Sequence, residues 1–378
     1  MASPAGFATF FDVRAALLAR QEIALLDVRE EDAHAQGHPL FAANFPLARL
    51  ETNAWAALPR RCVPVVVLDG GAGEAQRAAG RLSDLGYTDV RVLEGGVAGW
   101  QEAGGELFRD VNVPSKAFGE LVESQRYTPS LSAEEVRELI DRKADIVIVD
   151  ARRFDEYRTM SIPSAISVPG AELVLRVPAL APDPNTRVIV NCAGRTRSII
   201  GAQSLINAGI ANPVAALRNG TIGWMLAGQA LEHAQGRRFG VVAETVRRQA
   251  AHSARQLADR AGVRRATGAA LARWNQQDGR TTYRIDVRTP EEYEEGHLGG
   301  FRPVPGGQLV QETETTAPVR GARLVLFDND GVRANMSASW LAQMGWEVHV
   351  LDGIGAADLT ATGAWQPPLP PEPVVKLI

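Results

Sequence analysis

The sequence has few cysteines and histidines for its length, which limits the kinds of site it can build. Its 378 residues include two cysteines, Cys62 and Cys192, and six histidines. Two cysteines cannot form the disulfide network that holds small secreted domains together. No Cys-x-x-Cys pair is present, and two cysteines with six histidines do not easily make a zinc site, so none is expected. A single reactive cysteine in a reducing compartment is consistent with this composition.

A strong charge of one sign and long apolar runs are also missing. The formal net charge is −4, whereas nucleic-acid binders usually carry a basic surface. No apolar run approaches the roughly 20 residues that span a membrane. The N-terminal segment lacks the basic start, apolar core and cleavage site of a signal peptide. We therefore expect a cytoplasmic protein that binds neither nucleic acid nor membranes.

One pattern occurs three times along the chain. Each copy begins with a short apolar run that ends in Asp-x-Arg and is followed by an acidic segment that favours a helix. The aspartates of this motif are Asp27, Asp150 and Asp286. An internal repeat of this kind indicates one fold used several times, and the chain is long enough for two or three domains.

A second segment follows each motif at a constant distance. It consists of an apolar run typical of a strand, a loop of small residues, and an amphipathic helical stretch that ends in glycine. The residue directly after the run lies 42 positions beyond the aspartate in every copy, and the glycine lies 17 positions further. The residues after the run are Asp69, Cys192 and Asp328, and the glycines are Gly86, Gly209 and Gly345. A third apolar run follows, with a tryptophan soon after it in the first two copies only.

The order of these segments predicts the fold class. Strands that alternate with helices indicate parallel strands joined by right-handed crossovers, and runs such as VVVL, IVIV and LVLF are typical of strands buried on both faces. We expect an α/β protein with three tandem domains, each a small, doubly wound, mostly parallel sheet with helices on both faces. Ligands of such sheets bind beyond the carboxyl ends of the strands, where Cys192 is expected to lie.

The spacing also predicts the domain boundaries. We expect domains over residues 1–123, 124–236 and 263–378, with a helical linker over 237–262. The linker is rich in alanine and arginine and is interpreted as a spacer helix packed between domains, with a basic docking surface as the alternative. The proline-rich tail is expected to be extended.

These motifs together resemble the rhodanese superfamily, and in particular its multidomain sulfurtransferases. The typical pattern is Asp-x-Arg, Glu-Tyr, Gly-His-Leu, a Cys-x-x-x-x-Arg-Ser loop and Gly-Gly-x-x-x-Trp. The middle copy supplies Asp150, Arg152, Glu156, Tyr157 and the loop over 192–198, and the third copy supplies DVRTPEEYEEGHLGG. The resemblance covers residues from about 8 to 355.

The sequence departs from the family pattern in several places. The middle copy has Ser161-Ile162 in place of Gly-His, and the first and third copies have aspartate in place of the cysteine. The first copy also has Glu74 in place of the loop arginine, whereas the third keeps Arg333. We therefore expect the first and third domains to be inactive and the middle domain to be catalytic.

The resemblance implies a thiosulfate sulfurtransferase with Cys192 as the nucleophile and a substrate-binding loop that follows it. That loop consists of Ala193, Gly194, Arg195, Thr196, Arg197 and Ser198. Amide groups of the loop and of the helix start are expected to point at the sulfur and to stabilise a thiolate. Arg195 and Arg197 add positive charge, Gly194 is expected to curl the turn through a positive φ, and Ser198 offers a hydroxyl donor.

The expected reaction has two steps. The Cys192 thiolate takes the outer sulfur of a small anionic donor such as thiosulfate, and a thiophilic acceptor such as cyanide or a thiol then removes it. This chemistry requires no metal and no organic cofactor. A protein acceptor is not identified by the sequence, and mercaptopyruvate stays open as a donor, although the loop differs from the pattern associated with it.

Two other functions stay open. A persulfide carrier, sensor or scaffold would use the same cysteine without rapid turnover, which suits a chain in which two of three domains lack it. A phosphatase or arsenate reductase of the same fold usually has five residues between its cysteine and arginine, whereas four lie between Cys192 and Arg197. Position 198, where the longer loop would place its arginine, is Ser198.

The remaining candidates are interpreted as structural. Arg152 belongs to a motif found in all three copies, so an ion pair is expected, and His38 and His297 are expected in turns. Cys62 is interpreted as the first residue of a buried strand, with a resolving or acceptor thiol as the alternative. A buried core position is the alternative for Cys192. Asp69 and Asp328 are expected to accept the hydrogen bonds of their own loops.

Overall fold

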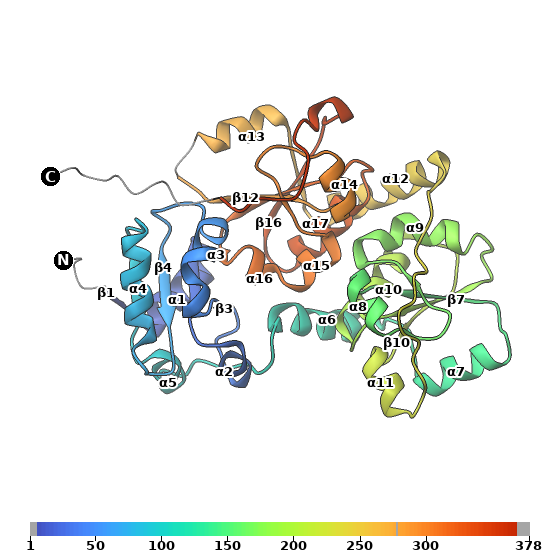
Figure 1. The fold of residues 1–378 in the computed structure, drawn as a ribbon, viewed down its shortest axis with the longest axis horizontal. Helices are drawn as coiled ribbons and strands as arrows, with labels where there is room; N and C mark the ends of the chain where they lie inside the picture. The colour runs from blue at the N-terminus through green and yellow to red at the C-terminus, as the bar shows by residue number, and fades with distance from the viewer. Residues whose placement is uncertain (1–5, 277–278, 369–378) are drawn as a thin grey trace.

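The computed structural model of the chain describes residues 6–276 and 279–368. It contains three α/β units, drawn in blue, green and orange in Figure 1. Each unit has a parallel sheet with helices on both sides, as the sequence predicts. Most of the proline-rich tail, residues 369–378, lies outside the described residues. Within the described residues, no helix is both long and apolar enough to cross a membrane.

The first unit has five strands of its own, in the order β1-β5-β4-β2-β3. The pairs within this set are parallel. The strands are β1 (Gly6–Ala8), β2 (Ile23–Asp27), β3 (Ala43–Asn44), β4 (Val65–Leu68) and β5 (Val90–Leu93). The helices are α1 (Phe10–Leu18), α2 (Glu31–Gln36), α3 (Leu50–Ala57), α4 (Glu74–Asp84) and α5 (Gly96–Glu102). Helix α6 (Val113–Arg126) leads from this unit to the second one.

The second unit repeats this arrangement with the strand order β6-β10-β9-β7-β8, again parallel. Its strands are β6 (Ser130–Leu131), β7 (Ile146–Asp150), β8 (Ile166–Ser167), β9 (Arg187–Asn191) and β10 (Val214–Leu217). Its helices are α7 (Ala133–Asp141), α8 (Phe154–Thr159), the 3₁₀ turn η2 (Gly170–Glu172), α9 (Leu173–Leu180), α10 (Thr196–Ala208) and α11 (Gly220–Leu226).

The third unit has the order β11-β16-β15-β12-β13. Its strands are β11 (Arg264–Ala266), β12 (Thr282–Asp286), β13 (Arg302–Pro303), β15 (Arg323–Phe327) and β16 (Glu347–Leu351). Its helices are α13 (Gly268–Asn275), α14 (Pro290–Glu295), α15 (Gly306–Gln311), α16 (Thr313–Thr316) and α17 (Arg333–Gln343). Among the described residues after β16, the third unit has only a 3₁₀ turn, η3 (Ala356–Asp358). The other two units have at this point the helices α5 and α11, which carry the tryptophan that the third copy of the sequence pattern lacks.

The Asp-x-Arg motif closes the turn at the end of one strand in each unit. In the second unit the Asp150 carboxylate accepts hydrogen bonds from the backbone N–H of Arg152 at 3.1 Å and from its side-chain Nε at 2.9 Å. The same guanidinium donates to the carbonyl of Met160 at 2.6 Å. Equivalent bonds join Asp27 to Arg29 and Asp286 to Arg288. The structural interpretation of Arg152 is therefore confirmed.

The first and third units share a sheet and a core. Strand β14 (Val319–Arg320) leaves the third unit and pairs antiparallel with β2 of the first unit. The hydroxyl of Tyr283 donates to the carbonyl of Ala57 at 2.6 Å, and one apolar cluster extends through both units. The sequence pattern did not predict this joint.

The second and third units meet through helix α12 (Glu244–Arg260), which lies within the expected linker. It packs against α9 and α17 and buries Ala250, Ala254 and Ala258. The linker is therefore a packed spacer, because its small residues face both units. Helix α6 also packs against the second unit, along α10.

Cys62 corrects one expectation of the sequence analysis. Strand β4 begins at Val65, and Cys62 lies in the preceding turn with its side chain exposed. Pro64 lies between them and has no N–H group to donate to a neighbouring strand, so the strand cannot extend back to the cysteine. The interpretation of Cys62 as a buried strand residue was wrong.

Candidate active site

Cys192 lies directly after β9, where the carboxyl ends of the parallel strands meet. The adjacent Asn191 fixes this edge, because its side-chain amide donates to the Asp150 carboxylate at the end of β7, at 2.8 Å. The Cys192 residue is 2% exposed. Cys192 is therefore a buried residue at the start of the loop that connects β9 to α10.

Helix α11 holds the loop from the side of the neighbouring strand β10. The backbone N–H and the hydroxyl of Thr221 both donate to the Cys192 carbonyl, at 2.9 and 2.8 Å. The N–H of Ile222 donates to the Ala193 carbonyl at 3.0 Å. These three bonds fix the backbone of the cysteine and of the residue that follows it.

The start of α11 approaches the loop so closely that only glycine fits. Gly220 has a φ of +52°, and a Cβ added to it would lie 2.2 Å from the Cys192 carbonyl oxygen. Gly194, in contrast, is not among the residues with positive φ, and a Cβ added there would have no neighbour within 4 Å. The prediction of a positive φ at Gly194 was wrong. The glycine with a positive φ that lies close to the loop backbone is Gly220.

The two loop arginines point to different carboxylates. Arg195 donates to Glu120 at 2.8 and 2.9 Å and also to Glu123, both on α6. Arg197 donates to both oxygens of Glu156 at 2.7 and 2.9 Å. The sequence analysis identified the arginines but not these partners.

The Arg197–Glu156 pair is mostly buried and stays charged. Burial alone would raise the pKa of Glu156, but the hydrogen bonds and charge of Arg197 outweigh it and lower that pKa. Burial alone would likewise lower the pKa of Arg197, but Glu156 raises it, with smaller contributions from Cys192 and Asp150. Arg197 is therefore a fixed positive charge in the loop that follows Cys192.

The other loop residues have structural partners. The Ser198 hydroxyl donates to the Arg195 carbonyl at 2.8 Å, within the first turn of α10. Thr196 faces α6, where a Cβ added to Gly119 would lie 3.0 Å from the Thr196 methyl carbon. The loop is thus fixed to α10, α11 and α6.

The corresponding loops of the other two units are filled by carboxylates. Asp69 accepts from the N–H of Gly71 at 2.8 Å and of Ala75 at 3.1 Å. Asp328 accepts from Gly331 at 3.0 Å and from Ala334 at 2.8 Å. The expectation that these aspartates occupy their own loops is confirmed. Burial and the neighbouring Asp330 raise the pKa of Asp328 to about 8.

The third unit keeps an equivalent of the Arg197–Glu156 pair, whereas the first unit has lost both residues. In the third unit Arg333 pairs with Glu292, and also with Glu172 of the second unit at 2.8 Å. Its side chain is 1% exposed, so it belongs to the joint between the units. In the first unit Ala33 and Glu74 replace both members of the pair.

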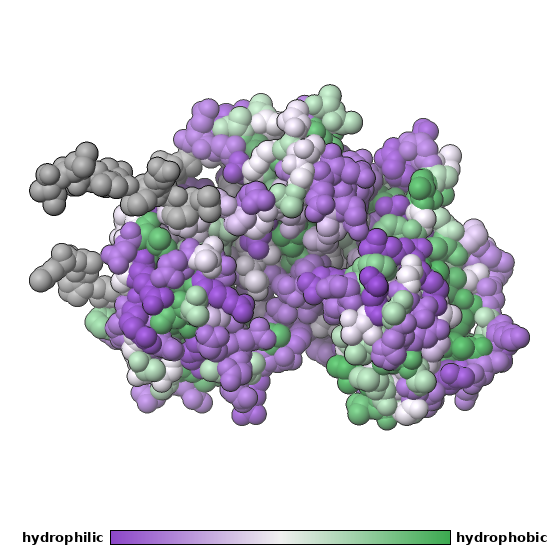
Figure 2. Space-filling view, in the orientation of Figure 1, coloured by the Kyte–Doolittle hydropathy of each residue, from purple (hydrophilic) through white to green (hydrophobic). Residues whose placement is uncertain are grey.

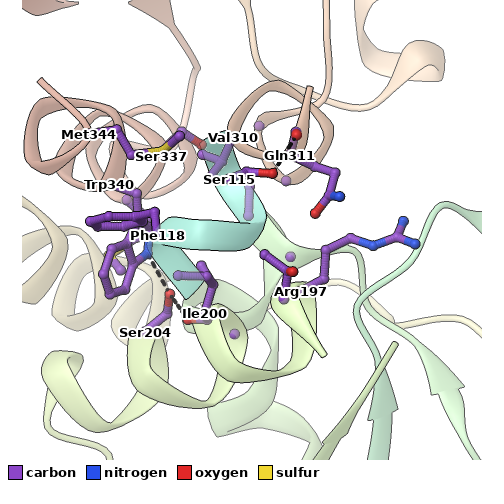
Figure 3. A pocket seen from close by; sticks show the side chains of 17 residues that line it. Ser115, Phe118, Arg197, Ile200, Ser204, Val310, Gln311, Ser337, Trp340 and Met344 are labelled. Atoms are coloured by element: carbon purple, nitrogen blue, oxygen red, sulfur yellow. Dashed lines mark hydrogen bonds between the residues drawn. The ribbon is translucent and has the colours of Figure 1, made fainter. Parts of the chain in front are cut away.

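A small cavity lies beside the loop, at the joint of α6, the second unit and the third unit (Figure 3). Its volume of about 30 Å³ is close to that of one water molecule. The indole N–H of Trp340 donates to Ser204 at 2.8 Å across it. The cavity is therefore too small for a substrate and is a packing gap. Figure 3 labels its lining residues Ser115, Phe118, Arg197, Ile200, Ser204, Val310, Gln311, Ser337, Trp340 and Met344.

The outer face of α11, next to the loop, is apolar. Ile222, Met225 and Leu226 are 50%, 46% and 83% exposed. The surface where α11 lies, at the lower edge of the second unit, is green in Figure 2. The same positions of α5 in the first unit are Ala98, Gln101 and Glu102. The surface beside Cys192 therefore differs from its counterpart in the first unit.

Comparison with known families gives three matches along the chain. The model of the rhodanese-like domain matches residues 12–103, 132–227 and 269–354. The three matched ranges correspond to the three structural units, and together they cover more than half of the chain.

One solved structure is similar over almost the whole chain. It is the thiosulfate sulfurtransferase from Pseudomonas aeruginosa, with 70% sequence identity and a TM-score of 0.96. The match covers 97% of this chain and 70% of that one. Among curated proteins, the uncharacterized protein YibN of Escherichia coli K12 is 31% identical over 85 residues, which are 22% of this chain and 59% of YibN. The chain thus matches about three fifths of the length of that relative.

Proposed function

Because this chain belongs to the rhodanese-like family, we propose that it is a sulfurtransferase that carries sulfur on Cys192. The proposed donor is thiosulfate or a similar anionic sulfur compound, and the proposed acceptor is cyanide or a thiol. The similarity to the Pseudomonas aeruginosa thiosulfate sulfurtransferase supports this choice of donor. A reducing compartment such as the cytoplasm would keep the thiol available.

The observation that carries the proposal is the common loop of the three units. In the first and third units a side-chain carboxyl group accepts the loop and helix N–H groups at the position of Cys192. The backbone approach of the following glycine is also shared, since a Cβ on Gly96 would lie 2.4 Å from the Asp69 carbonyl oxygen. The loop thus directs N–H groups at the side chain in this position, and such groups favour a negative charge there. In the second unit that charge would be the thiolate or persulfide of Cys192.

The first step is a displacement at sulfur. The Cys192 thiolate attacks the outer sulfur of thiosulfate, a sulfur–sulfur bond forms to the cysteine, and the bond to the sulfonate sulfur breaks. Sulfite leaves with the electron pair of that bond. The persulfide that remains is anionic, so the same N–H groups are proposed to hold it as they hold the carboxylates of the other units.

Arg197 is proposed to attract the donor and to stabilise the leaving sulfite. The bidentate contact with Glu156 fixes the orientation of its guanidinium. Arg195 is held by two carboxylates of α6, whereas Arg197 pairs with one, so the positive charge of Arg195 is the more fully compensated. We therefore assign donor binding mainly to Arg197, together with the backbone of residues 193–198.

The second step returns the enzyme to its starting state. The acceptor attacks the outer sulfur of the persulfide, forms a bond to it, and displaces the Cys192 thiolate, which keeps the electron pair. With cyanide the product is thiocyanate. Such a covalent relay predicts ping-pong kinetics.

The units that lack the cysteine are proposed to be scaffolds. Their loops are already occupied by Asp69 and Asp328, and a carboxylate cannot accept sulfane sulfur. Domain limits at residues 123, 236 and 262 remain part of this proposal, and α6 crosses the first of them.

The experiment is to incubate the full chain with thiosulfate and to analyse the peptide that contains Cys192 by mass spectrometry. We expect a gain of one sulfur atom on this peptide, which cyanide removes with formation of thiocyanate. Cys192→Ser should abolish turnover, and Cys62→Ser is the matched control that should retain it. Equal turnover by Cys192→Ser and the unmodified chain would refute the proposal, and hydrolysis of a phosphomonoester would favour the phosphatase alternative.

A further inference from the structure

A large cavity lies between the first and third units, on the joint that β14 completes. Its volume is about 880 Å³, and residues of both units line it. Pockets of about 300–1,000 Å³ accommodate small organic ligands. The cavity does not include any residue of the Cys192 loop, so it is distinct from the proposed active site.

Four arginines give this cavity an excess of positive charge. They are Arg20, Arg60, Arg264 and Arg280, and the acidic residues of the lining are Glu22 and Glu347. Glu22 pairs with Arg60 at 2.5 Å, and Glu347 pairs with Arg280 at 2.9 Å. The lining thus has two more positive than negative side chains. A surface of this kind attracts small anions.

Cys62 places a nucleophilic atom in this cavity. Its side chain is exposed, and the guanidinium of Arg60 donates to its sulfur at 2.9 Å. Arg60 is in turn oriented by Glu22. Cys62 is therefore an exposed residue of the cavity lining with one guanidinium beside its sulfur.

We propose that this cavity binds small organic anions and that Cys62 is a site of S-thiolation by disulfides of anionic thiols. The cavity volume and the excess of arginines select the anion, and the exposed Cys62 supplies the covalent step. This site is independent of sulfur transfer at Cys192.

The covalent step is a thiol–disulfide exchange. Cys62 loses its proton to solvent, and its sulfur attacks one sulfur of the incoming disulfide. A new sulfur–sulfur bond forms to Cys62, the bond of the reagent breaks, and one anionic thiolate leaves with the electron pair. The Cys62 sulfur is oxidised and the leaving sulfur is reduced, so no further oxidant is required.

The test uses the full chain with Cys192→Ser, in which Cys62 is the remaining thiol. Its modification rate is measured with 5,5′-dithiobis(2-nitrobenzoate), whose disulfide carries two carboxylates, and with cystamine, whose disulfide carries two ammonium groups. The ratio of the two rates is compared with the ratio for the same chain unfolded in urea, which gives the intrinsic reactivity of the reagents. We expect the folded chain to favour the anionic disulfide about tenfold more than the unfolded chain does.

Two arginines of the cavity offer exposed positions for variants. Arg264 has a side chain that is 65% exposed, and Arg20 is also exposed, so neither substitution should disturb the core. Arg20→Gln combined with Arg264→Gln should lower the anion preference at least about threefold. Arg248→Gln, on the exposed face of α12, is the matched control and should leave it unchanged.

Salt gives a second measurement that needs no variant. Sodium sulfate should slow the anionic reagent more than sodium chloride at equal ionic strength, because sulfate competes for the cavity and chloride mainly screens charge. Equal rate ratios in the folded and unfolded chain would overturn the proposal. An unchanged preference in the double variant, or equal effects of the two salts, would overturn the assignment of this cavity as the anion site.

Discussion

The close approach of Gly220 to the Cys192 loop predicts a large effect from a single methyl group. A Cβ added to Gly220 would lie 2.2 Å from the Cys192 carbonyl oxygen and 2.8 Å from that of Gly194. Carbon and oxygen atoms that are not bonded to each other normally stay more than about 3 Å apart, as in the close Cα–H to carbonyl contacts of sheets. In Gly220→Ala the loop must therefore move by about 1 Å, relative to α11.

Two separate costs contribute to the loss of stability. Alanine at a φ of +52° costs about 1–2 kcal/mol, because its Cβ crowds the following carbonyl. Forcing an additional carbon into a packed site costs a further free energy of about 1–3 kcal/mol. We expect a destabilisation of about 3 kcal/mol in total. A displacement of about 1 Å at a reacting group reduces the rate on the order of a hundredfold.

Gly194→Ala in the same loop is the matched control. A Cβ at Gly194 would have no neighbour within 4 Å, so we expect a change in stability within about 0.5 kcal/mol and nearly full activity. The assays are thiocyanate formation from thiosulfate and cyanide, and urea unfolding followed by circular dichroism. If Gly220→Ala were as active and as stable as Gly194→Ala, the assignment of Gly220 as the residue that shapes the loop would be refuted.

Further predictions concern the ion pairs, the filled loops and the joint. Arg197→Gln should raise the KM for thiosulfate on the order of tenfold, whereas Arg195→Gln should change it little, since α6 compensates that charge; steady-state kinetics distinguishes them, and equal effects would contradict the assignment. The pKa of Glu292 is lowered from 4.5 to about 2, because Arg333 outweighs the effect of burial. Its stabilisation is thus complete above pH 4.5 and is lost as the pH falls through about 2. The advantage of the unmodified chain over Glu292→Gln, about 3 kcal/mol at neutral pH, should disappear over this range in urea titrations; a constant difference would argue against the pair. Asp69→Asn should destabilise the protein by about 1–2 kcal/mol in the same titration, because one loop N–H loses its acceptor; unchanged stability would contradict the filled-loop interpretation. Gly321→Ala places a Cβ 2.5 Å from a backbone carbonyl of the first unit and should lower the Tm without changing kcat; a large loss of kcat would show that the joint acts on the site.

The arrangement of each unit could be predicted because it depends on local order in the sequence. The constant distance from Asp27, Asp150 and Asp286 to the next strand end fixes which residues meet at the sheet edge. Cys192 and its two counterparts therefore lie where the sequence analysis expected them, immediately after β9, β4 and β15.

The partners of the loop could not be predicted because they come from other parts of the chain. Arg195 is held by Glu120 and Glu123 of α6, and nothing in the spacing of the repeats indicates where this helix lies. Strand β14 has two residues, too few for a recognisable pattern, and it pairs with a different unit. Such contacts depend on packing between units, which the repeat does not encode.

The sequence contains the information that predicts a positive φ at Gly220, although the prediction was made for Gly194. A glycine within the cysteine loop, Gly194, suggested a positive φ there. The comparison with the first unit points elsewhere, because Gly96 precedes Trp100 by the same number of residues as Gly220 precedes Trp224. Both glycines have positive φ and contact the carbonyl of the loop residue.

The pairing of β14 with β2 has a consequence for the order in which the chain folds during synthesis. The first unit emerges from the ribosome before the others. Strand β3 covers β2 only at Leu26 and Asp27, so the edge of β2 at Ile23 and Ala24 stays open until residues 319 and 320 have been made. The second unit has all of its strands once residue 217 is complete. We therefore expect the cysteine-bearing unit to complete its sheet before the unit that precedes it. Until β14 has been made, the open part of the β2 edge is available for pairing with other chains, which chaperones or rapid folding would prevent.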